Sequence, residues 1–397
     1  MFVRFAILSR IPKGVWVLGG VSLLMDVSSE MIHSLLPLFM ATTLGASVII
    51  IGLIEGFAEA TALIIKVFSG VLSDYLGKRK GLALLGYGMG AFSKPLFALA
   101  ASSGLVFGAR MIDRVGKGIR GAPRDALVAD VTPPDIRGAA FGLRQSLDTA
   151  GAFLGPLLAV GLMFLWSNDF QSIFWVAVIP GALAIALLYF GLDEPKTPIT
   201  NKRTNPLTRE NLAKLSSAYW WVVGLGSLFT LARFSEAFLV LRAQQMEIPL
   251  FAIPLVMVAM NLVYGLTAYP FGKLSDGMSH SKMLQAGLLV LIAADLVLAL
   301  SHHWSVLLLG VGLWGIHMGM TQGLLAAMIA HTAPAELRGT AFGMFNLMSG
   351  IALLLASAGA GILWETLGAA STFYAGAAIC VITLAGMHCI PSAYRQA

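Results

Sequence analysis

The sequence predicts an all-α polytopic membrane protein with twelve transmembrane helices in two pseudo-symmetric halves, and three observations support this prediction. Of the 397 residues, 57% are hydrophobic and only 12% are charged, whereas soluble domains have about 25% charged residues. Apolar windows of roughly 20 residues, the length that spans a bilayer as a helix, recur along the whole chain. Finally, short sequences of the first half return in the second.

The apolar windows place the twelve spans in order. They cover residues 15–44, 48–73, 81–101, 104–131, 134–166, 170–192, 216–246, 249–274, 283–300, 304–331, 335–364 and 369–390. Strands of a membrane barrel would alternate over about ten residues, and runs such as 288–300 do not alternate. The first span contains acids and lacks a small-residue cleavage site, so we interpret it as a retained helix and not as a signal peptide.

The distribution of Lys and Arg predicts the orientation in the membrane. Sixteen of the 26 cations fall at the termini or in alternate loops, and the opposite loops contain none. Because cytoplasmic loops hold the excess of cations, we predict an integral protein of the bacterial inner (plasma) membrane with both termini in the cytoplasm. The net charge of +6 then reflects contact with the membrane, and we expect no nucleic-acid partner.

A polar linker and an internal repeat divide the chain. The segment 193–215 is rich in proline and charge, and it separates predicted domains at 1–192 and 216–397, each of six helices. The residues at 70–74, GVLSD, return at 272–276 as GKLSD, and residues 133–142 correspond to 334–343 at an offset of 201. Agreement at the same place in each half indicates a duplicated unit.

The loop at 70–80, GVLSDYLGKRK, resembles the signature loop between helices 2 and 3 of the major facilitator superfamily of secondary transporters, with Asp74, Gly77 and Arg79 on its characteristic positions. Helix 4 resembles a second motif through Arg110. Helix 5 is similar to the motif of the family's drug:proton antiporters through Gly151, Gly155 and Pro156, although Ala159-Val160 replaces the usual glycine pair. The resemblance implies two six-helix bundles that alternate access to a central cavity, and no enzymatic activity.

Ten cations lie inside the predicted spans, eight of them in the first half. A charge at the bilayer centre costs at least about 2.5 to 3.5 kcal/mol, so these groups must face one another or water. In helix 4, Asp113, Lys117, Arg120 and Arg124 follow steps of four, three and four, which places them on one face. The repeat puts Trp314, Met318, Thr321 and Leu325 at the matching positions of helix 10. A charge needed only to hold the fold would tend to recur in both halves, so the absence of all four charges from helix 10 favours a functional role for the stripe.

These charges supply the candidate site residues. A proton carrier needs a carboxylate whose environment changes between states, and guanidinium groups bind anions through paired hydrogen bonds. The candidates for proton coupling are Asp26, Glu30, Asp113 and Asp148. The candidates for substrate binding are His33, Glu59, Arg114, Lys117, Arg120, Arg124, Arg144, Arg233 and Glu236. The candidates for gating latches are Asp74, Arg79 and Asp276.

A structural alternative is a lattice of ion pairs in which Glu30 neutralises an arginine and Asp125 and Asp130 neutralise Arg120 and Arg124. No other metal-ligating residues accompany the histidines at a suitable spacing, and the sequence has no glycine-rich loop of the kind that binds a nucleotide phosphate. We therefore expect neither metal nor cofactor. The expected partners are protons, a small-molecule substrate and membrane lipid, with the chain as a monomer.

The sequence therefore favours a proton-coupled secondary transporter of a small organic solute, and efflux by proton antiport is the preferred prediction. Proton symport of an organic anion, such as a carboxylate chelator, is the alternative that the basic stripe supports. A rival of another class is a polytopic membrane enzyme that would use Asp26, Glu30 and His33 on a lipid-borne substrate. The repeat argues against the enzyme, because matched loops in both halves suit a rocking transporter.

Overall fold

The computed structural model describes residues 10–76, 78–194, 212, 214–275, 278–321, 323–334 and 337–388, with the backbone alone at 71, 74–76, 134, 275 and 388. Over these ranges all regular structure is helical and no strand occurs. The all-α prediction is confirmed.

The helices follow the predicted spans to within a few residues. The main ones are α2 (Lys13–His33), α4 (Val48–Leu76), α5 (Arg79–Ala98), α6 (Ser103–Val131), α7 (Arg137–Leu165), α8 (Phe170–Gly191), α10 (Ser217–Ala232), α11 (Ala237–Gln244), α12 (Leu255–Ser275), α13 (His280–Ala299), α14 (Trp304–Thr321), α15 (Leu324–Thr332), α16 (Arg338–Leu367) and α17 (Ala369–His388). Short turns α3 (Leu36–Leu38), η1 (Phe39–Thr43), η2 (Pro134–Ile136) and η3 (Leu250–Ala252) complete the described elements.

Ten helical segments of the described chain are long and apolar enough to cross a membrane. The two further predicted spans, α5 and α6, fall below that measure. Lys94 and several glycines lower the hydropathy of α5, and eight charged residues lower that of α6. Charges at this density inside a bundle need partners, so α5 and α6 are where the functional chemistry is to be sought.

The first and the seventh predicted spans are interrupted. The first ends as an α-helix at His33 and continues through α3 and the short π-helix η1. The seventh divides into α10 and α11 around residues 233–236. At this break the N–H of Ser235 donates to Ser357 Oγ on α16 at 3.1 Å instead of to a helical carbonyl. Apolar periodicity cannot foresee such a break, because a side chain distant in sequence replaces the backbone acceptor.

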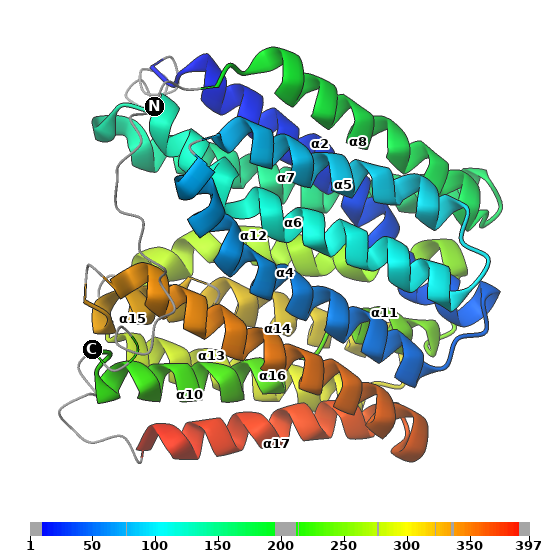
Figure 1. Cartoon of the computed structure of the whole chain (residues 1–397). Coiled ribbons are helices and arrows are strands. Elements are labelled where there is room, and N and C mark those ends of the chain that lie inside the picture. The colour runs from blue at the N-terminus through cyan, green and yellow to red at the C-terminus, as the bar shows by residue number, and fades with distance from the viewer. Residues whose placement is uncertain are drawn as a thin grey trace. The chain divides into compact units, whose positions relative to one another are not determined.

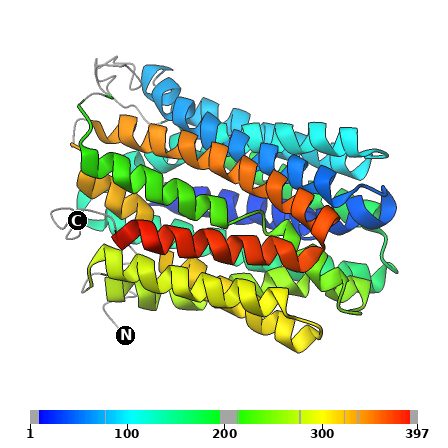
Figure 2. The same cartoon turned by 90° about the horizontal axis from the view of Figure 1, so that it is seen from below.

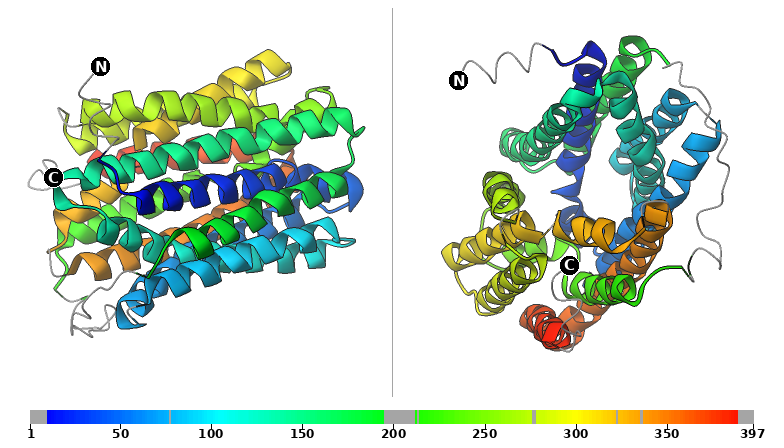
Figure 3. Two further views of the ribbon diagram at one scale, coloured as in Figure 1. Left: turned by 90° about the horizontal axis from the view of Figure 1, so that it is seen from above. Right: turned by 90° about the vertical axis from the view of Figure 1, so that its left-hand side faces the viewer.

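The described helices pack into two units. Unit 1 draws on Met1–Leu36 and Ile64–Thr204, and unit 2 on Pro37–Leu63 and Asn205–Ala397. In unit 1, α2 packs along α7 and α8, and α5 packs along α6 and α8 (Figures 1 and 3). In unit 2, α10 packs along α16 and α17, while α13 packs along α14 and α17 (Figure 2). The helix α4 is shared, since its residues 48–63 belong to unit 2 and 64–76 to unit 1.

Glycines allow the closest helix approaches, because they leave room for a neighbouring backbone. A Cβ atom at Gly155 of α7 would lie 2.7 Å from Glu30 Cβ and 2.9 Å from the Val27 carbonyl oxygen of α2. A Cβ at Gly151 would likewise lie 2.7 Å from the Leu23 carbonyl oxygen. Gly161, on the same helix, has no atom within 4 Å of that position. Gly151 and Gly155 therefore set the spacing of α2 and α7, and Gly161 does not.

We expect Gly155→Ala to lower the melting temperature of the purified protein, because the new methyl group must push two backbones apart at a cost of about 1 to 3 kcal/mol. Gly161→Ala is the matched control, and it should leave the melting temperature unchanged or raise it slightly, since alanine favours the helix. Scanning fluorimetry in detergent measures both. Equal melting temperatures for the two variants would show that the α2–α7 spacing is not set by Gly155.

Candidate functional site: a charge network in unit 1

The first part of the network surrounds Asp113 of α6. Lys94 of α5 donates from Nζ to Asp113 Oδ1 at 2.7 Å and to Ser29 Oγ of α2 at 3.0 Å. Lys94 is 0% exposed and Asp113 is 2% exposed. The helices α5 and α6 can come this close because Gly116 has no side chain. A Cβ atom there would lie 2.6 Å from the Gly86 carbonyl oxygen. The pair Lys94–Asp113 is thus a buried ion pair that joins three helices.

Histidine 33, at the end of α2, connects this pair to further charges. Its Nε2 lies 3.5 Å from Asp113 Oδ2, and its Nδ1 lies 3.5 Å from Glu30 Oε1. Arg114 approaches the same ring, with Nη2 3.0 Å from Nδ1, and its Nε lies 3.7 Å from Asp113 Oδ2. Glu30 and His33 are three residues apart on α2, which places them on one face, and the two side chains form one cluster with Asp113 and Arg114.

A second cluster contains two arginines and two aspartates from α6 and α7. Arg144 pairs with Asp148 one turn further along α7. Arg124 Nε lies 3.1 Å from Asp125 Oδ1, and Arg124 Nη1 lies 3.8 Å from Asp148 Oδ2. Arg144 Nε closes the group at 3.8 Å from Asp125. These four charges cancel, which suits a low-dielectric environment.

Asp26 and Arg120 differ from the other charged candidates of this unit. In the described part of the chain, Asp26 makes no hydrogen bond and no ion pair within 4 Å, although Asp148, Arg120, Lys117 and Glu30 are near enough to act on its charge. Arg120 is 4% exposed, and its guanidinium lies 4.7 Å from the centre of the Tyr87 ring. Its Nη1 has no acceptor among the described residues. The carboxylate of Asp26 and the guanidinium of Arg120 therefore have no direct ion-pair partner among the described residues, although the charged groups around them are paired.

The remaining candidates are distributed over both units. Lys117 is exposed on α6. Glu59 of α4 lies in unit 2 with Arg233 and Glu236, which flank the break between α10 and α11. Arg233 lies 5.8 Å from the centre of the Phe229 ring. The structure thus brings His33, Arg114, Arg124 and Arg144 into the unit 1 network and places Lys117 near Asp26 and Glu30, while Glu59, Arg233 and Glu236 belong to unit 2.

The predicted neutralisation scheme is correct in one part and wrong in another. Asp125 pairs with Arg124 as expected. Asp130 pairs with Arg79, one of the gating candidates, where the scheme expected Arg120 or Arg124. Asp130 lies near the end of α6 and Arg79 at the start of α5, so packing of these two helices decides the pairing. The side chain of Asp74 and the whole of Asp276 lie outside the described residues.

Lys94 is the functional candidate that sequence reasoning missed. It lies fifteen residues into α5, outside any motif, and has no charged neighbour at helical spacing on its own helix. The one signal was its presence as a lone cation in an apolar window. Its partner on α6 could be found only from the packing of α5 against α6.

Comparison with known proteins identifies the class. The model of the Major Facilitator Superfamily matches residues 18–260 and 228–395. The MFS-type transporter MJ1317 of Methanocaldococcus jannaschii is 33% identical over 382 residues, covering 94% of each chain. The multidrug resistance protein MdtH of Photorhabdus laumondii is 26% identical over 183 residues, covering 46% of this chain and 44% of that one.

A solved structure has the same fold. The crystal structure of a POT family transporter in complex with 5-aminolevulinic acid superposes with a TM-score of 0.80 at 14% identity, covering 95% of both chains. The chain belongs to the major facilitator superfamily and is an integral membrane transporter. Members of this family are transporters and not enzymes, which disfavours the membrane-enzyme alternative.

We expect Lys94→Leu to destabilise the purified protein by about 3 to 5 kcal/mol, because it leaves the buried Asp113 carboxylate without its nearest cation. The double variant Lys94→Leu/Asp113→Leu should be less destabilised than the single variant, since no orphaned carboxylate remains. Denaturant unfolding of both single variants and the double gives the coupling energy. Additive effects would mean that the two side chains do not stabilise each other.

Proposed function

We propose that the chain is a proton-coupled secondary transporter of the inner membrane that exports a small organic solute by antiport. The observation that carries this proposal is Asp26, a half-buried acid of α2 with no ion-pair partner among the described residues, close to Arg120, which also has none. Every other proton-coupling candidate is paired: Glu30 with His33, Asp113 with Lys94, and Asp148 with Arg144.

An unpaired acid among cations is suited to exchange. A proton and a cationic group of a solute both neutralise a carboxylate, so they compete for Asp26. Each occupant leaves when the other binds, and this exclusion is the requirement for antiport. The export direction draws on the resemblance of helix 5 to the antiporter motif and on the similarity to MdtH, a multidrug resistance protein.

We expect Asp26→Asn to abolish the dependence of transport on the pH gradient and to weaken solute binding without abolishing it, because the solute keeps its other contacts. The amide keeps the size of the side chain and cannot carry the proton. A cargo would first be found by a thermal-shift screen of cationic, anionic and neutral solutes, and transport would then be followed in proteoliposomes with an imposed pH gradient. Glu30→Gln tests the second acid, whose contact with His33 predicts a smaller loss.

Asp125→Asn is the control for that experiment, because it removes an acid of the same network that already pairs with Arg124 and should keep the pH-gradient dependence. If Asp26→Asn and Glu30→Gln both transport with the normal dependence, neither acid carries the coupled proton. The screen would then still identify a cargo, and the family assignment would stand.

One observation favours proton symport of an organic anion as the second candidate. Arg120 is a buried cation with no carboxylate partner among the described residues, and it acts electrostatically on Asp26. If a proton neutralised Asp26, Arg120 would be freed to bind an anion, and proton and anion would move together. The same proteoliposomes separate the two functions, because solute uptake acidifies the lumen in symport and alkalinises it in antiport.

Alternating access would use the shared helix α4. Its first half packs on α16, where a Cβ at Gly361 would lie 2.9 Å from the Val48 carbonyl oxygen and one at Gly56 would lie 3.1 Å from that of Leu354. The N–H of Ile49 also donates to Glu365 Oε2 at 3.2 Å. We infer that the first half of α4 separates from α16 once in each transport cycle, because a helix whose two halves belong to different units must part from one of them when the units move separately.

A disulfide between α4 and α16 should therefore arrest transport. A Cβ at Gly56 would lie 3.2 Å from Ser357 Cβ, close to the separation of about 3.5 to 4.5 Å that a disulfide needs. In Gly56→Cys/Ser357→Cys we expect oxidation to stop solute exchange in proteoliposomes and a reductant to restore it. The single-cysteine variants should be unaffected by the oxidant. Full exchange by the cross-linked protein would exclude separation of α4 from α16 as a step of the cycle.

A further inference from the structure

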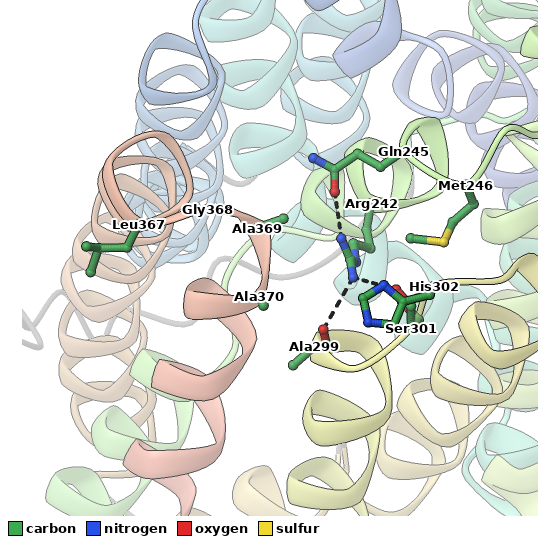
Figure 4. Close-up of a pocket in the computed structure, with 10 residues that line it drawn as sticks. All are labelled: Arg242, Gln245, Met246, Ala299, Ser301, His302, Leu367, Gly368, Ala369 and Ala370. Carbon is green, nitrogen blue, oxygen red and sulfur yellow. Dashed lines mark hydrogen bonds between the residues drawn. The ribbon is translucent and has the colours of Figure 1, made fainter.

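Unit 2 contains a cavity that the transport proposal does not use. Its volume is about 410 Å³, and its walls come from α11, the segment after α13 and the turn between α16 and α17 (Figure 4). The polar lining residues are Arg242, Gln245, Ser301 and His302, and the first residues of α17, Ala369 and Ala370, complete one wall. No residue named above as a transport candidate lines it.

Arg242 brings a positive charge to this cavity. The side chain is 8% exposed, and Nε donates to the Leu298 carbonyl at 3.1 Å. Nη2 donates to the carbonyls of Ala299 at 3.3 Å and Ser301 at 2.6 Å, and Nη1 donates to Gln245 Oε1 at 2.7 Å (Figure 4). All four acceptors are neutral. A guanidinium has five N–H donors, so one N–H on Nη1 has no acceptor among the described residues.

The rest of the lining adds donors and no negative charge. Gln245 uses its oxygen for Arg242, which leaves its amide nitrogen as a donor. His302 is exposed beside Ser301 and presents an imidazole. The first N–H groups of a helix have no intrahelical acceptor and carry a positive partial charge, and α17 begins at this wall. No Asp or Glu is among the lining residues.

Capping alone does not account for this arrangement. The carbonyls that Arg242 binds lie at the carboxyl end of α13, where a cation is favourable, and this contact explains the orientation of the guanidinium. It does not explain why an open cavity beside a buried cation contains donors from three elements and no acid. The cap instead holds Arg242 in a fixed position, which lowers the entropic cost of binding a ligand.

The cavity lies where α11 and α13 end and α17 begins, and these helix ends belong to loops without Lys or Arg. Helix ends of spanning segments meet the lipid headgroups, and the cavity also contacts the apolar side chains of Met246 and Leu367. We propose that this cavity binds the phosphate group of a glycerophosphate, with Arg242 and His302 as its cationic contacts. The source is a phospholipid headgroup or a soluble phosphate ester.

Binding of two probes to the full-length protein tests the proposal. Glycerol 3-phosphate is titrated against protein in a neutral detergent, and phosphatidylglycerol is titrated in the same detergent with phosphatidylcholine as the zwitterionic comparison. We expect His302→Glu to weaken binding of the preferred probe at least tenfold, because it places a carboxylate in the cavity. His303→Glu is the matched control, since it makes the same charge change at the next residue, which does not line the cavity.

The two probes separate the sources. Tighter binding of phosphatidylglycerol than of glycerol 3-phosphate, lost in His302→Glu, assigns the site to a lipid headgroup, and the reverse order assigns it to a soluble phosphate ester. Both variants should melt close to the temperature of the parent, because both positions are exposed and a glutamate at 303 can still accept from the Ser305 N–H that His303 now accepts from. Absence of binding by either probe, or equal weakening by His302→Glu and His303→Glu, would overturn the proposal. Transport activity is not part of this readout, so failure here leaves the transport proposal intact.

Discussion

The structure depends on one constraint, which is that charges placed inside a membrane span must be neutralised locally. An isolated ion in a low-dielectric region is strongly unfavourable, and a pair is tolerated only with good geometry. Unit 1 meets this constraint with the buried pair Lys94–Asp113 and with the group of two arginines and two aspartates around Asp148. Against this background Asp26 and Arg120 are exceptions, and an unneutralised charge is the kind of group that a proton or a charged solute can occupy.

The close approach of helices makes these pairs possible. Side chains on different helices meet at hydrogen-bond distance only where the backbones are near, and Gly86, Gly116, Gly151 and Gly155 supply that proximity. Glycine at these positions sets the spacing of the helices and so determines which charges face one another. A packing change at Gly155 would therefore also move Glu30, whose Cβ lies at that contact.

Hydropathy predicts the helices well, since the need for about 20 apolar residues is a property of the chain alone. Helical spacing likewise predicts pairs within one helix, such as Arg144 with Asp148 and Glu30 with His33. Pairs between helices are different. The contact of Arg79 with Asp130 and that of Lys94 with Asp113 depend on the packing of α5 on α6, and the break at 233–236 depends on Ser357 of α16. Sequence periodicity contains no information about these.

The two halves of the repeat have kept their loops and diverged in chemistry. Where α6 carries charges, the matching positions of α14 and α15 hold Trp314, Met318, Thr321 and Leu325, all buried. In unit 2, Arg242 is held by carbonyls instead of carboxylates. Asp295 of α13 is 0% exposed and has no hydrogen-bond partner among the described residues. The duplicated fold thus keeps the same loops in both halves, while the buried charges of each half are stabilised by different groups. Because the described residues of unit 1 stabilise their buried charges through a connected network of carboxylates and cations, the coupling chemistry is expected there.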